Sequence, residues 1–234
     1  GSFGYVPALD GMRALAVGAV LLFHGEVGVA PGGFLGVSMF FTLSGFLITT
    51  LLLVEHEATG TVALRTFFAR RLRRLTPAAY LCILLVIAFG WRWNATQRQR
   101  LPGDVVASVL DVANWRFALA GTSYQDLFIG APSPLAHFWS LAIEEQCYLL
   151  LPLLAWWGLR RGVRTFTVLV AGLLVLSITA TLLTSNRDLV YYGTHTRAAE
   201  LLVGVLLALA LRRWSVPDRW RGAIGTAGLL AVVI

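Results

Sequence analysis

The segment FLGVSMFFTLSGFLITTLLLV, residues 34–54, decides the fold class because 21 consecutive positions carry no charged side chain. A helix that spans a bilayer needs about 20 mostly apolar residues. The whole chain agrees, since 57% of its 234 residues are hydrophobic and only 13% are charged. Soluble domains carry about 25% charged residues, so a soluble domain, a disordered chain and a collagen-like repeat are excluded. We therefore predict an all-α, polytopic transmembrane helical bundle.

Six further apolar segments resemble spans. The first ends at His24, and the last reaches Ile234 while still apolar, so we expect residues 1–234 to be a single membrane-embedded domain that is incomplete at its C-terminus. The six segments are residues 9–23, 78–91, 134–157, 166–184, 198–211 and 222–234. The fragment is thus predicted to hold about seven spans.

Residues 102–120 are moderately apolar but contain two aspartates, an asparagine and an arginine. They could form a poor span, or an amphipathic or re-entrant segment on the outer side. All basic residues of the chain are arginines, and cytoplasmic loops are enriched in them. If residues 102–120 do not cross, twelve arginines share one side and six the other. We therefore predict a non-crossing segment, a cytoplasmic N-terminus and a multi-pass protein of the bacterial plasma (inner) membrane.

Two polar residues of the first span are candidates for function, because polar groups within a span cost energy. Arg13 and His24 are 11 residues apart, so they project from one helical face about 16.5 Å apart. Arg13 is expected near the cytoplasmic end and His24 at the outer end. The alternative is an ordinary interfacial pair, with a snorkelling arginine and a histidine that caps the helix.

A second set lies in the segment HFWSLAIEEQCY, residues 137–148. His137, Ser140, Glu144 and Tyr148 follow offsets of three and four, so they line one helical face. Such a stripe could handle protons, or it could be a buried network that fixes helix packing. Glu145 points to another face and is the weaker candidate.

A third set is the basic cluster Arg70, Arg71, Arg73 and Arg74 beside the third span. It could reflect topology and attraction to anionic lipid, or it could bind a phosphorylated ligand through its guanidinium groups. Farther along, Arg197 and Glu200 form an i,i+3 pair that is more often structural than catalytic.

Other chemistries find little support. The chain has no GxSxG elbow, P-loop, HExxH or acidic metal cluster, and its two cysteines are isolated. We expect no metal and no tightly bound cofactor. The net charge is +7, and most of the arginines that produce it lie between the predicted spans. This distribution is typical of a membrane protein, so we expect the lipid bilayer, and no nucleic acid, as a partner.

Five stretches follow one another along the chain: LDGMRALAV (9–17) with His24, GGFLGVSMFFTLSGFLI (32–48), FARRLRRLTP (68–77), HFWSLAIEEQCYLL (137–150) and TRAAELLVG (196–204). Together they resemble the acyltransferase 3 family of integral-membrane O-acyltransferases, which modify bacterial envelope carbohydrates. Two departures are Ser38, where an acidic residue is often seen, and Cys147, where an aromatic is usual.

The resemblance implies about ten spans in the complete domain and transfer of an acyl group, acetyl or another short acyl, from cytoplasmic acyl-CoA to a hydroxyl of an extracytoplasmic carbohydrate or glycolipid. His24 would be the general base, and Glu144 and Arg13 would assist it. Acyl-CoA would be the co-substrate, and its phosphates would be bound by arginines. The residues expected to bind acyl-CoA are Arg13, Arg70, Arg71 and Arg74, and those expected at the acceptor are Ser44, His137, Ser140, Tyr148 and Arg197.

Two other functions stay open at this stage. A lipid or glycolipid transporter or flippase would use the polar residues to line a path through the membrane, although no inverted repeat is visible. A structural scaffold would leave Arg13 and Glu144 without a purpose inside the membrane.

Overall fold

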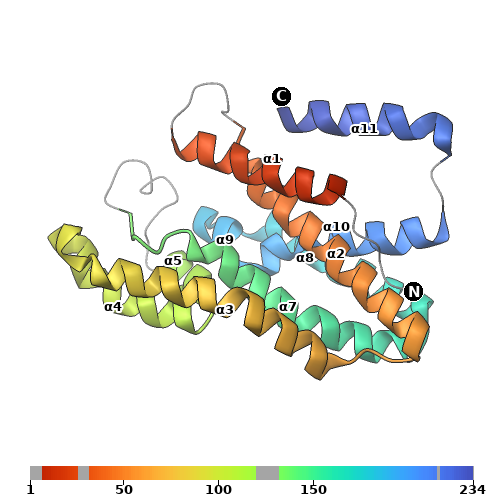
Figure 1. Ribbon diagram of the computed structural model, residues 1–234, viewed down its shortest axis with the longest axis horizontal. Helices are drawn as coiled ribbons and strands as arrows, with labels where there is room; N and C mark the ends of the chain where they lie inside the picture. Colours follow the sequence, from red (N-terminus) through yellow and green to blue (C-terminus); the bar gives the residue numbers. More distant parts are fainter. Residues whose placement is uncertain (1–6, 26–31, 120–131, 215–216, 234) are drawn as a thin grey trace. The chain divides into compact units, whose positions relative to one another are not determined.

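The computed structural model describes residues 7–25, 32–119, 132–214 and 217–233. Every regular element in these ranges is helical, which confirms the all-α prediction (Figure 1). The elements are α1 (Pro7–His24), α2 (Leu35–Thr59), α3 (Leu64–Ala88), η1 (Gly90–Arg92), α4 (Ala95–Val109), α5 (Ala113–Leu119), α7 (Phe138–Leu159), α8 (Val163–Leu183), α9 (Arg187–Tyr192), α10 (Thr194–Arg213) and α11 (Asp218–Val233).

Four stretches of the described helices are long and apolar enough to cross a membrane: α1, α2, α8 and the α9–α10 stretch Arg187–Arg213. The other three predicted spans fall on α3, α7 and α11. The first half of α3 carries five arginines, α7 carries two glutamates, and α11 has 16 residues. Seven spans therefore remain a prediction.

The helix that carries the third predicted span begins well before that span. Pro77 lies inside α3, which starts at Leu64 and includes the whole basic cluster. Proline removes one backbone donor but does not oblige a helix to end. The arginines therefore lie on the helix itself, and a span that starts after Pro77 stays a prediction.

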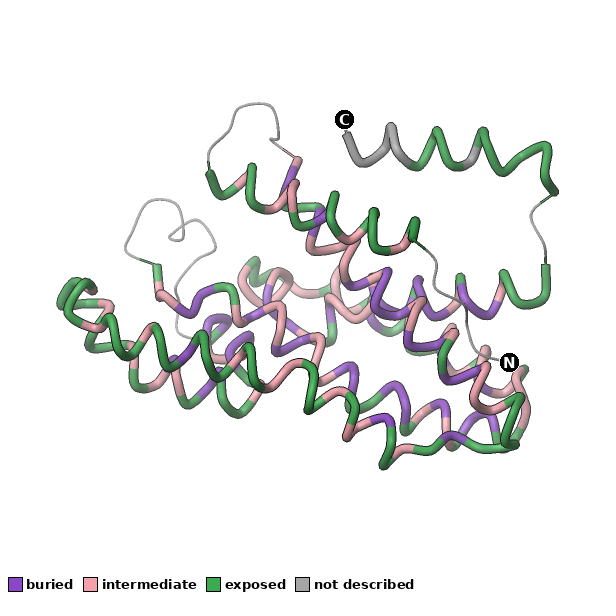
Figure 2. Tube along the Cα trace, viewed as in Figure 1, coloured by how far each residue is buried: buried purple, intermediate pink, exposed green. Residues whose placement is uncertain are grey.

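The chain divides into two compact units. Unit 1 comprises Gly1–Gly60, Thr167–Ala171 and Glu200–Ile234, and unit 2 comprises Thr61–Phe166 and Gly172–Ala199. The helices differ in how far their side chains are buried. The side chains described in α11 of unit 1 are exposed, whereas α7 of unit 2 carries many buried ones (Figure 2).

In unit 1, α1 and α2 approach closely at small residues. A Cβ on Gly33 would lie 2.2 Å from the Ala19 carbonyl oxygen, and one on Gly36 would lie 2.5 Å from that of Ala16. Small residues allow such backbone contact between membrane helices. A Cβ on Gly32, by contrast, would meet nothing within 4 Å. Gly33 is therefore the residue that the contact requires.

A second close contact in unit 1 joins α2 to α10. A Cβ on Gly45 would lie 2.1 Å from the Leu201 carbonyl oxygen, and a Cβ on Gly204 would lie 2.0 Å from that of Thr42. Neither glycine can accept a side chain without separation of the two helices. These reciprocal contacts fix where α2 and α10 cross.

In unit 2, residues 102–120 form the end of α4, a turn and α5, as far as they are described. Asp111 in the turn has a φ of 54°, a left-handed value that asparagine and aspartate tolerate better than most residues. The buried Asn114 of α5 donates to the Tyr192 carbonyl (2.9 Å) and to the Thr194 hydroxyl (3.0 Å). The segment thus folds back on other helices of unit 2.

Gln146 of α7 completes this polar cluster. Its Nε2 donates to the Asp111 carbonyl (2.7 Å) and to Asn114 Oδ1 (3.0 Å), and its Oε1 accepts from the Thr194 hydroxyl. Buried polar groups are costly unless paired, and these amides have partners on four helices, α5, α7, α9 and α10. Beside the cluster, Arg116 Nε pairs with the buried Asp104 carboxylate at 2.6 Å, which joins α5 to α4.

Candidate active site

His24 is the last residue of α1 and is exposed. Its Nδ1 lies 2.8 Å from the Val20 carbonyl oxygen, and its ring meets the Phe23 ring edge-on at 5.5 Å. A carbonyl oxygen only accepts, so Nδ1 carries the hydrogen of the neutral ring. The lone pair is then on Nε2, which is the atom that a general base uses.

Arg13 lies on the same uninterrupted helix, as the sequence predicted. Its side chain is half-buried, and its Nε has no hydrogen-bond partner among the residues that the structure describes. A buried donor without a partner costs free energy. An anionic ligand would satisfy it.

Ser44 is buried on α2, next to the α2–α10 crossing at Gly45. Earlier on α2, Ser38 donates to Glu200 Oε1 at 3.1 Å, and Thr42 donates to the Glu200 carbonyl at 3.0 Å. The serine at position 38 therefore forms a hydrogen bond to the side chain of Glu200 on α10.

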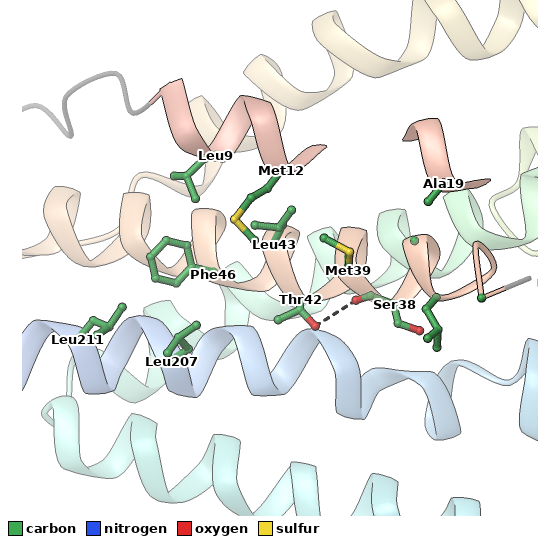
Figure 3. Close-up of a pocket in the computed structure, with 13 residues that line it drawn as sticks. Leu9, Met12, Ala19, Ser38, Met39, Thr42, Leu43, Phe46, Leu207 and Leu211 are labelled. Carbon is green, nitrogen blue, oxygen red and sulfur yellow. Dashed lines mark hydrogen bonds between the residues drawn. The ribbon is translucent and has the colours of Figure 1, made fainter. Parts of the chain in front are cut away.

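An apolar groove of about 550 Å³ runs along unit 1 between α1, α2 and α10 (Figure 3). Both methionines of the chain, Met12 and Met39, line it, and Ser38 and Thr42 add hydroxyls. Methionine adapts its shape to flexible apolar groups. The groove can accommodate a thin, largely apolar group. Its other lining residues are Leu9, Ala19, Gly32, Leu35, Gly36, Leu43, Phe46, Leu207 and Leu211.

The predicted polar stripe of residues 137–148 lies on α7 of unit 2. His137 is exposed at the residue before the helix, and its carbonyl accepts from the Ser140 hydroxyl at 3.2 Å. Glu144 is half-buried, and Tyr148 is 5% exposed. The stripe is helical from Ser140 onward, so its three helical members share one face.

The basic cluster of α3 separates into two environments. The guanidinium of Arg71 lies 4.5 Å from the Tyr148 ring centroid and 5.7 Å from that of Phe67. Glu145 of α7 interacts electrostatically with Arg71 and with Asp111. Arg70 and Arg74, by contrast, are exposed. Arg71 thus attaches α3 to α7, and its neighbours remain accessible.

Arg197 lies in an aromatic cluster of unit 2. Its Cζ is 5.6 Å from the Trp139 ring centroid and 5.5 Å from that of Tyr191, and the two rings are 4.8 Å apart. Sequence reasoning missed both rings, although Trp139 stands beside His137 in the motif and Tyr191 precedes Arg197. The cluster brings the start of α7 to the start of α10.

The candidate residues thus gather in two places. Arg13, His24 and Ser44 belong to unit 1, and the stripe, the basic cluster and Arg197 belong to unit 2. The pairing of His24 with Glu144 joins residues of different units and stays a prediction. Among the described residues, no group of three metal-ligating side chains is present.

Comparison with known proteins places these motifs in a family. A family model described as an acyltransferase domain matches residues 6–234. Peptidoglycan O-acetyltransferase OatA of Listeria monocytogenes is 41% identical over 98% of this chain and 38% of its own length. Putative peptidoglycan O-acetyltransferase YrhL of Bacillus subtilis is 40% identical with the same coverage, and O-acetyltransferase OatA of Staphylococcus aureus is 39% identical over 87% of this chain and 34% of its own.

The chain spans less than two fifths of the length of these curated relatives. No solved structure matches it significantly. The family match, in contrast, covers nearly every residue and includes all five motif stretches. The chain therefore belongs to the acyltransferase 3 family.

Proposed function

We propose that the protein transfers an acetyl or other short acyl group to a hydroxyl of a cell-wall carbohydrate. The observation that carries this proposal is the 41% identity, over 98% of the chain, to a relative named peptidoglycan O-acetyltransferase. An extracytoplasmic glycan is accordingly the proposed acceptor.

His24 is the proposed general base. Its Nδ1–H is held by the Val20 carbonyl, which supports Nε2 as the atom that takes the proton of the acceptor hydroxyl. The hydroxyl oxygen attacks the acyl carbonyl carbon, the carbon–sulfur bond of the thioester breaks, and the thiolate receives the proton from the imidazolium. Glu144 is proposed to orient the imidazole, as a carboxylate does in hydrolase triads.

Acyl-CoA is the proposed donor, and the protein would bind it at two kinds of surface. Arg70 and Arg74 are exposed and suit its phosphates, because guanidinium groups match phosphate oxygens. The apolar groove of unit 1 suits its thin pantetheine arm. Arg13, whose Nε lacks a described partner, suits an anionic or carbonyl oxygen of the donor.

The proposed topology has seven spans in this part of the chain, with the N-terminus in the cytoplasm of a bacterium and the protein in its inner membrane. The arginine distribution supports it, because the larger number then faces inward. His24 would lie at the outer end of α1, and Ser44, His137, Ser140, Tyr148 and Arg197 would contact the acceptor or support groups that do.

The test compares histidine variants in cells that make the full-length protein. We expect His24→Ala to remove almost all alkali-labile acetyl esters from the envelope glycan, measured by chromatography of the released acetate. His56→Ala is the matched control, because this histidine also lies near the end of a helix and has no proposed role. Full esterification with His24→Ala would overturn the base assignment. Lipid movement across the membrane without ester formation would favour a transporter.

A kinetic measurement tests the donor site. Arg70→Gln with Arg74→Gln should raise the KM for acetyl-CoA by about tenfold and change kcat little, since each lost charged contact removes about 0.7 kcal/mol of binding. Arg98→Gln with Arg100→Gln, which removes two exposed arginines of α4, should leave KM unchanged. An unchanged KM in both variants would exclude the phosphate contact.

A further inference from the structure

The turn between α7 and α8 in unit 2 carries a second basic cluster that the proposed function does not use. Three arginines fall within five residues, at positions 160, 161 and 164, and two tryptophans precede them at 156 and 157. All three arginines are exposed. We call Trp156, Trp157, Arg160, Arg161 and Arg164 the α7–α8 tip.

The tip is built with defined geometry. The Cζ of Arg160 lies 4.0 Å from the Trp156 ring centroid, and that of Arg161 lies 3.8 Å from the Trp157 ring centroid. Each pair is four residues apart, so both stacks lie along α7. A cation–π contact with an indole face restricts the position of a guanidinium. Arg161 also donates from Nη1 to the Trp157 carbonyl oxygen at 3.3 Å, which holds its side chain against the end of α7. Both guanidiniums are thus held on indole rings at the same end of α7.

The charges of the tip are not neutralised within the described chain. None of the three arginines forms an ion pair with a carboxylate among the described residues. The C-terminal dipole of α7 offsets about half a charge, but Arg164 lies in the first turn of α8, where the helix dipole disfavours a cation. An anion from outside the chain would relieve this excess.

The position of the tip in the chain indicates where such an anion would come from. The tip includes the first turn of α8, and α8 is long and apolar enough to span a bilayer. Tryptophan is enriched at the level of the lipid headgroups, and Trp157 is 41% exposed. We propose that the α7–α8 tip binds the phosphodiester headgroup of an anionic phospholipid, with the two stacked guanidinium forks on the phosphate oxygens.

The experiment measures retained lipid by native mass spectrometry. The full-length protein is purified in micelles that contain equal amounts of phosphatidylglycerol and phosphatidylcholine, and adducts of each are counted. The wild type should retain phosphatidylglycerol preferentially. Arg160→Gln with Arg161→Gln should reduce that preference about fivefold for each arginine removed, from about 1 kcal/mol per charge near a membrane surface.

Three comparisons keep the result specific. Arg160→Lys with Arg161→Lys keeps the charge and loses the stacked forks, so its preference should fall between wild type and the glutamine variant. Arg98→Gln with Arg100→Gln should keep the wild-type preference.

An unchanged preference in Arg160→Gln with Arg161→Gln would overturn the site, and lysine variants equal to wild type would overturn the role of the stacked forks. Displacement of phosphatidylglycerol by coenzyme A, through the same arginines, would assign the site to the acyl donor instead. This inference does not depend on the catalytic proposal.

Discussion

Unit 1 and unit 2 are stabilised by different means. In unit 1, backbones meet at glycines, and the contact at Gly45 admits no Cβ. In unit 2, a cluster of amides and a hydroxyl, centred on Asn114, joins α5 to α7 and α10. The glycine contacts of unit 1 are disrupted by an added side-chain atom. The polar cluster of unit 2 is disrupted when a hydrogen-bond partner is removed. The difference indicates that opposite kinds of substitution will damage the two units.

The largest expected effect tests unit 1. Gly45→Ala should lower the free energy of unfolding by about 3 kcal/mol, because its Cβ would lie 2.1 Å from the Leu201 carbonyl oxygen and overpacking costs about 1–3 kcal/mol. Gly18→Ala on α1 is the matched control: its Cβ meets nothing within 4 Å, so alanine should stabilise the helix by about 0.5–1 kcal/mol. Circular dichroism during denaturation in detergent measures both. Shifts of the same sign would contradict the close contact.

The next effect tests unit 2. Asn114→Leu should cost about 2 kcal/mol, because it removes one hydrogen bond each from the Tyr192 carbonyl, the Thr194 hydroxyl and the Gln146 amide. The double variant Asn114→Leu with Gln146→Leu removes two members of the cluster together and should cost less than the sum of the single variants. Additive costs, measured in the same denaturation assay, would mean that the cluster is not a cooperative network.

A smaller effect concerns the ion pair between α4 and α5. Arg116→Met leaves the Asp104 carboxylate buried without its partner, and the arginine side chain is 36% exposed. We expect a cost of about 1–2 kcal/mol, below the 3–5 kcal/mol for a fully buried pair. Asp104→Asn in the same background should recover part of it. Equal stability of Arg116→Met and wild type would show that water replaces the pair.

The smallest effect is a pH dependence at Asp111, which lies between α4 and α5, outside the predicted spans. Burial raises the pKa of its carboxyl above the usual range. The folded state therefore binds the proton more tightly than the unfolded state, so the stability from protonation is present below pH of about 4 and is lost as pH rises through the raised pKa. Asp111→Asn, which suits the φ of 54°, should remove that loss. The same pH profile in both proteins would contradict the assignment.

The sequence predicted the helices better than their contacts. The apolar runs located α1, α2, α7, α8 and α10 to within a few residues, because helices that face lipid must be apolar along their length. The sequence did not indicate that α3 begins at Leu64, since a proline inside a helix has the same sequence signal as a proline before one. The sequence did not show which of Gly32, Gly33 and Gly36 meets α1, because the crossing depends on which face each helix presents.

The candidate site was predictable only in part. Arg13 and His24 share a helix, so their relation follows from helical geometry alone. The stacking of Arg71 on Tyr148 joins residues 77 apart in sequence, and Asn114 pairs with Thr194 across 80 residues. No local pattern encodes such pairs, because they arise only when separate helices pack together.

The most direct test of the central claim uses membrane vesicles of one orientation that contain the full-length protein. Radiolabelled acetyl-CoA is placed on the side that was cytoplasmic, and the glycan acceptor on the opposite side. We predict acetyl esters on the glycan with the wild type, none with His24→Ala, and none when donor and acceptor are both on the outer side. Equal labelling from either side, or full labelling by His24→Ala, would contradict transfer across the membrane to a histidine at the outer end of α1.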